Sequence, residues 1–81
     1  MLPILPTDLF RAFEWTAAAG ELAELREAKG DALRRYAAQS VANYAAHDAA
    51  DAELLSDLVM LAEWLQALSD EQFRDVEARA I

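Results

Sequence analysis

The 81-residue sequence contains no cysteine and one histidine, His47. Without cysteine the chain has no disulfide and no thiolate ligand for a metal. His47 and Asp51 stand four residues apart and could share a metal ion, but the Glu-x-x-His motif of di-metal helical bundles is missing. We therefore expect no metal site and no cofactor.

Glycine is scarce as well. Gly20 and Gly30 lie ten residues apart and cannot form a glycine-rich phosphate loop. A Ser-His-Asp arrangement has no local support, because Ser69 is typical of a helix cap and Ser40 falls on an expected buried face. Glutamates recur at three-residue intervals over residues 21–27, which is typical of a solvated helix face. The sequence therefore predicts that the protein is not an enzyme.

Long apolar runs are also missing. The longest one in the leucine-rich segment is "LVMLA", far short of the roughly 20 residues that a membrane span needs. The start, "MLPILPTD", lacks the basic region of a signal peptide. From these patterns we expect a soluble, cytoplasmic protein without a membrane partner.

Negative charge dominates what is present. The net charge is -8, and most of the excess lies in residues 48–81. Because exposed charges of one sign sum over a surface, such a field repels phosphate backbones and attracts basic partners. Direct nucleic-acid binding is therefore not expected. Arg34 and Arg35 form the basic pair of a stretch without acids, and we expect them to pair with the acidic C-terminal half rather than with a phosphate-bearing partner.

The sequence predicts one all-α domain over residues 1–81. At 56% hydrophobic residues the chain can build a core, and apolar side chains recur every three or four positions. Three helix-capping signals divide this pattern into segments, at Thr7, Asp31 and Ser69. Gln72 completes the signal at Ser69 as a capping box. The result is a small bundle of about four helices, at roughly 8–29, 31–47, 51–68 and 70–80, preceded by a short extended apolar arm at 1–6.

Two boundaries stay open in this pattern. The apolar stripe of the first helix changes sides near Gly20, so either this glycine ends or kinks the helix, or a straight helix has two apolar faces and lies between two layers. We favour one helix, bent or strained near Gly20. Between the second and third helices no glycine or proline enforces a break, and one long helix over 31–68 in a helical hairpin is the alternative. The polar pair His47 and Asp51 in mid-stripe favours a turn there.

The segment "LLSDLVMLAEWLQAL" is expected to form the central helix. Its leucines span one face of a helix, as core residues do, and they are Leu54, Leu58, Leu61, Leu65 and Leu68. Met60 and Trp64 widen the apolar arc on one side, where they lie at the rim of the core or contact a partner. Tryptophan and methionine are enriched at protein interfaces.

These features favour a non-enzymatic protein-binding module, an inhibitor or regulator that blocks a larger partner, and such a module can itself be a homodimer. Small inhibitors of phages and mobile elements, anti-CRISPR proteins among them, are similar in size and acidity, but no family motif is present. A nucleic-acid mimic with phosphate-like carboxylates and a structural homo-oligomer are the alternatives. The residues expected to contact the partner are Trp15, Asp57, Met60, Trp64, Asp70 and Glu71.

Overall fold

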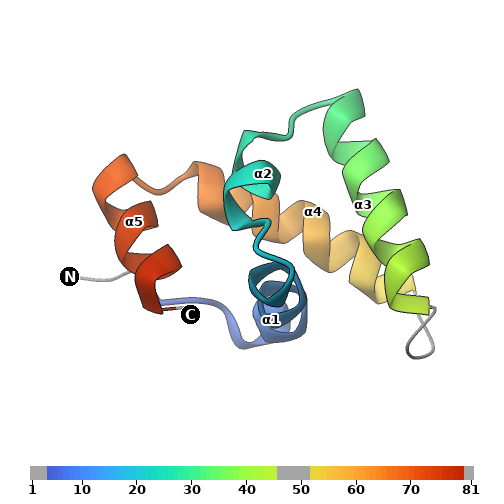
Figure 1. Cartoon of the computed structure of the whole chain (residues 1–81), viewed down its shortest axis with the longest axis horizontal. Helices are drawn as coiled ribbons and strands as arrows, with labels where there is room; N and C mark the ends of the chain where they lie inside the picture. The colour runs from blue at the N-terminus through green and yellow to red at the C-terminus, as the bar shows by residue number, and fades with distance from the viewer. Residues whose placement is uncertain (1–3, 46–51, 80–81) are drawn as a thin grey trace.

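The computed structural model describes residues 4–45 and 52–79, and the regular structure in these ranges is entirely helical (Figure 1). The predicted all-α class is therefore confirmed. The elements are a short 3-10 helix η1 (Thr7–Leu9) and the α-helices α1 (Phe10–Ala18), α2 (Leu22–Glu27), α3 (Asp31–Ala45), α4 (Ala52–Gln66) and α5 (Asp70–Arg79).

Helix α4 lies at the centre of the bundle. It packs against η1, α1, α2 and α3 (Figure 1). The predicted leucine stripe explains this position, because Leu54, Leu58, Leu61 and Leu65 are fully buried and Leu68 nearly so. Packing of α3 beside α4 also excludes the alternative of one straight helix over 31–68. The predicted break itself, at residues 47–51, lies outside the described residues.

The preference for one helix over residues 8–29 is wrong. Helix α1 ends at Ala18, and Gly20 adopts a left-handed backbone with φ +71°. The N–H of Gly20 donates to the carbonyl of Ala17 and the N–H of Glu21 to that of Thr16, both at 3.0 Å. This pair of bonds is a Schellman motif, which ends a helix by satisfying its last carbonyls. The reversal at Gly20 lets Leu22 and Leu25 of α2 reach the core.

Helix starts were predicted with mixed success. The N–H of Gln72 donates to Ser69 Oγ at 3.1 Å and the N–H of Ser69 donates to Gln72 Oε1 at 2.9 Å, which confirms the capping box of α5. Thr7 does not cap α1. It begins η1 instead, and no side chain caps either η1 or α1.

The segment before η1 is only partly attached to the bundle. Leu5 packs against the core, whereas Ile4 is 89% exposed. Of these two apolar residues of the arm, Leu5 therefore contributes to the bundle and Ile4 does not. Residues 1–3 of the arm lie outside the described ranges.

Candidate partner-binding surface

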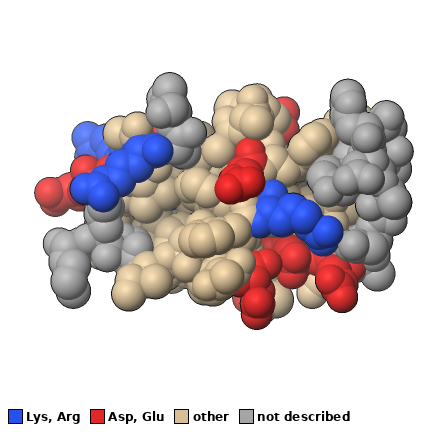
Figure 2. All heavy atoms as spheres, turned by 90° about the horizontal axis from the view of Figure 1, so that it is seen from below, with Lys and Arg blue, Asp and Glu red and all other residues tan. Residues whose placement is uncertain are grey.

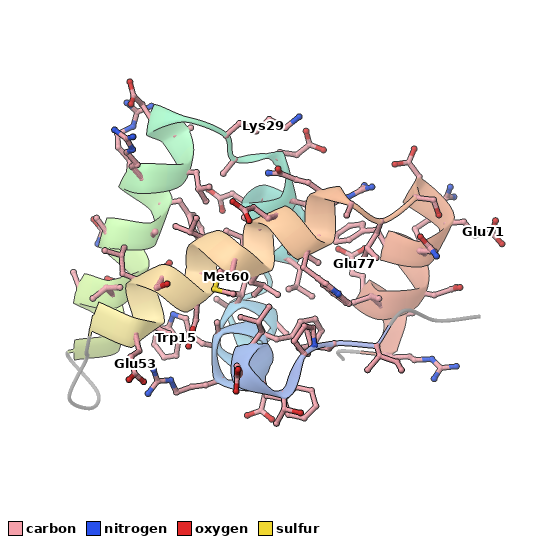
Figure 3. All side chains as sticks on the ribbon, turned by 180° about the vertical axis from the view of Figure 1, so that it is seen from behind. Trp15, Lys29, Glu53, Met60, Glu71 and Glu77 are labelled. Carbon is pink, nitrogen blue, oxygen red and sulfur yellow. The ribbon has the colours of Figure 1, made fainter. Side chains whose placement is uncertain are left out.

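Met60 is the most exposed of the predicted contact residues in α4, and it lies on the outer face of this helix. Met60 is 51% exposed, and Glu53 and Glu63 are exposed on the same helix. Figure 3 shows Met60 midway along α4 and Glu53 near its start, both at the edge of the helix toward α1 in this view. The side of α4 opposite the leucines is exposed as well, at Ser56, Glu63 and Ala67. We call Glu53, Ser56, Met60, Glu63 and Ala67 the α4 outer strip.

The edge of α4 next to this strip is closed by α1. Asp57 Oδ2 lies 4.0 Å from Arg11 Nη2 of α1, so this acid forms an ion pair within the chain. Trp64 is half-buried and packs against the core, and Trp15 of α1 is half-buried too. The two tryptophans therefore lie at the rim of the core, and Met60 is the residue of the predicted set that presents the most apolar surface.

A shallow hollow of about 300 Å³ adjoins the α4 outer strip. Its lining consists of Asp8 from η1 with Glu53, Ser56 and Asp57 from α4. Ser56 and Asp57 stand four and three residues before Met60, a spacing that puts side chains on one helix face. Within the described ranges no three His, Cys, Asp or Glu side chains are placed to hold a metal ion. The hollow thus carries three carboxylates, of which that of Asp57 is paired with Arg11.

The remaining predicted residues lie at the other end of the molecule. Asp70 and Glu71 are exposed in the first turn of α5, and Figure 3 shows Glu71 far along the molecule from Trp15 and Glu53. The Asp70 carboxylate accepts a hydrogen bond from Arg26 Nη1 at 3.1 Å. The structure thus brings Asp57, Met60 and Trp64 together on one helix and separates them from Asp70 and Glu71.

Arg26 of α2 joins three elements and was missed by the sequence reasoning. Its Nε donates to the carbonyl of Leu65 at 3.1 Å and its Nη2 to that of Leu68 at 2.8 Å. The guanidinium also lies over the Phe73 ring, 4.6 Å from its centroid. The ion pairing with the acidic half that was predicted for Arg34 and Arg35 is wrong for Arg34, which pairs with Asp31 of its own helix.

Charges of opposite sign are close together on the side of the molecule where α1 lies. Figure 2 shows Lys or Arg side chains beside Asp or Glu side chains near both ends of this face, with a broad uncharged area between them. Phe10, at the start of α1, is 49% exposed and was not predicted as a surface residue. The sequence gives no signal for its exposure.

A polar groove separates α2 from α3. It has a volume of about 420 Å³, and Tyr36 Oη donates a hydrogen bond across it to Glu21 Oε1 at 2.8 Å. Burial raises the pKa of Tyr36 to about 12; the hydrogen bond from Ser40 opposes this rise and the bond to Glu21 adds to it. The phenol is therefore neutral throughout the physiological range, and its O–H remains the donor of the hydrogen bond to the Glu21 carboxylate.

Comparison with known proteins gives no relatives. No family model, curated protein or solved structure matches the chain. Among the described helices, none is both long and apolar enough to cross a bilayer.

Proposed function

We propose that the protein is a non-enzymatic binding module that attaches to a larger protein through the α4 outer strip and the adjoining acidic hollow. The observation that carries the proposal is the position of Met60, which is half-exposed on the same side of α4 as Ser56 and Asp57, two residues that line the acidic hollow with Asp8 and Glu53. An exposed apolar side chain on the same helix as an acidic hollow fits a partner whose surface has an apolar recess with basic residues to one side of it.

The apolar side chain and the carboxylates of this surface contribute to binding in different ways. Burying the exposed part of Met60 supplies affinity, since full burial of a methionine side chain is worth about 1.5–3 kcal/mol. The carboxylates mainly raise the association rate and select against acidic partners. The net charge of -8 strengthens that second effect.

The contact must extend beyond α4 itself. A stable interface buries about 800 Å² on each partner, roughly one-seventh of the 5301 Å² exposed by this protein. The outer strip is only about 22 Å long, at 1.5 Å per residue, and one helix wide. The partner therefore covers the hollow and η1 as well as α4.

A role as inhibitor or regulator fits this picture, and the small size and acidity suit a cytoplasmic phage or mobile-element protein that blocks a basic site. Nucleic-acid mimicry ranks lower, because Asp57 and Asp70 already face arginines of the same chain. Mimicry predicts a complex that weakens steeply with salt. A homodimer through the same face would require two acidic surfaces to meet, and sedimentation at micromolar concentration detects it.

The test is quantitative affinity capture from cells that naturally express the gene, with the tagged wild type and two variants. Met60→Arg removes the apolar contact and reverses the local charge. Ala38→Arg is the matched control, since it adds the same side chain at an exposed position of α3. We expect a partner to be recovered with the wild type and with Ala38→Arg and to be depleted with Met60→Arg. Equal recovery with both variants, at unchanged helicity, would refute the proposal.

A further inference from the structure

The groove between α2 and α3 has a floor that is already hydrogen-bonded. Tyr36 Oη donates to Glu21 Oε1 at 2.8 Å, and Ser40, which is 5% exposed, hydrogen-bonds to the same phenol. These bonds fix the depth of the groove and do not involve Glu21 Oε2. The groove is therefore a preformed polar trough, and its volume of about 420 Å³ is in the range of ligand sites.

The walls of this trough carry opposite charges that do not neutralise each other. Glu21 and Glu24 line it from the side of α2, and Arg35 lines it from α3. Within residues 4–45 and 52–79, neither Glu24 nor Arg35 has an ion-pair partner. A ligand that places a cation beside Glu24 and a carbonyl or carboxylate oxygen beside Arg35 would give each of these charged side chains a partner.

Amide groups continue the α3 wall beyond Arg35. Gln39 Nε2 donates to Asn43 Oδ1 at 3.1 Å, and this bond uses neither Gln39 Oε1 nor Asn43 Nδ2. One free acceptor next to one free donor matches the N–H and C=O of a peptide group. Arg35, Gln39 and Asn43 are spaced by four residues, so the row is about 12 Å long. An extended chain covers that length with three to four residues, at about 3.3–3.6 Å each.

We propose that the α2–α3 groove binds an extended peptide segment of three to four residues that carries one lysine or arginine. The basic side chain lies between the Glu21 and Glu24 carboxylates. Its backbone oxygens face Arg35, and its next peptide groups meet Gln39 and Asn43. This site lies on different helices from the α4 outer strip and does not depend on the function proposed for that strip.

The experiment is a titration of the ¹⁵N-labelled full chain at low ionic strength, followed by amide chemical shifts. The probe is an acetylated, amidated tetrapeptide of three alanines and one arginine, and the same peptide with glutamate in place of arginine is the control. We expect the arginine peptide to shift amides of α2 and α3 around Glu24 and Gln39, and the glutamate peptide to have no effect there. Equal shifts with both peptides, shifts spread over all acidic surfaces, or no shifts would overturn the proposal.

A matched pair of variants sharpens the test. Glu24→Gln should lower the affinity for the arginine peptide about two- to fivefold, which is the effect of losing one exposed ion pair. Glu27→Gln removes the same charge from the same helix but lines a different hollow, beside Lys29, and should leave the affinity unchanged. Met60→Arg should also leave it unchanged, which separates this site from the α4 outer strip. If Glu27→Gln loses as much affinity for the arginine peptide as Glu24→Gln does, the effect comes from net charge alone and the proposed site is refuted.

Discussion

Replacing Arg26 by alanine is expected to destabilise the bundle by about 2–4 kcal/mol. The side chain is only 16% exposed and donates to the carbonyl of Leu65 in the last turn of α4 and to that of Leu68, two residues beyond the helix. After allowance for partial solvation, each of these charged hydrogen bonds is worth about 1 kcal/mol or more. The contact with the Phe73 ring adds about 0.5–1 kcal/mol. The pair with Asp70, which is 83% exposed, adds less than about 1 kcal/mol.

Urea denaturation followed by circular dichroism measures this loss. In a domain of this size 1 kcal/mol corresponds to about 4–8 °C in Tm, so Arg26→Ala should melt roughly 8–32 °C lower. Arg26→Lys keeps the charge but not the planar fork and should recover only part of the loss. Asp70→Asn should cost less than about 1 kcal/mol. The control is Arg34→Ala, whose exposed ion pair should contribute almost nothing. Surface substitutions usually change the free energy of unfolding by no more than about 0.5 kcal/mol. If the free energies of unfolding of Arg26→Ala and Arg34→Ala differ by less than that, the guanidinium does not hold α4 and α5 together.

Four further predictions concern the core, the helix break and pH. Leu61→Ala should cost about 2–5 kcal/mol in urea denaturation, whereas Leu55→Ala, at a 43% exposed position, should cost far less; similar losses would contradict the assigned core. Thr16→Val should stabilise the fold by about 1 kcal/mol, because the buried Oγ1 has no hydrogen-bond partner among the described residues. Gly20→Ala should cost about 1–2 kcal/mol from its left-handed backbone alone, since an added Cβ meets no atom within 4 Å. The raised pKa of Tyr36 contributes stability that is complete below its unfolded value near 10 and is lost as pH rises toward about 12, so Tyr36→Phe should flatten the stability profile in that window.

Local signals predicted the parts of the fold that depend on local contacts. The leucines of α4 are recognisable because a buried helix face repeats every three or four residues. The Ser69 cap of α5 is recognisable because both of its hydrogen bonds close within one turn. Gly20 was harder, since glycine within a helix costs only about 1 kcal/mol and propensity alone does not distinguish a bend from a stop.

Long-range contacts could not be predicted in the same way. The carbonyls bound by Arg26 are 39 and 42 residues away in the sequence, and nothing near Arg26 indicates them. Met60 and Trp64 widen the same side of the helical wheel, yet Met60 is half-exposed while Trp64 packs on the core. Which of the two becomes a surface residue depends on where α1 packs against α4, and the helical wheel of α4 does not contain that information.

The most direct test of the proposed binding surface is site-specific photo-crosslinking in cells that naturally express the gene. A benzophenone amino acid is placed at position 60 of the α4 outer strip and, as the control, at position 38 on α3. The account predicts a discrete adduct with a different protein at position 60 and none at position 38. No adduct at position 60, the same adducts at both positions, or an adduct made only of two copies of this chain would contradict it.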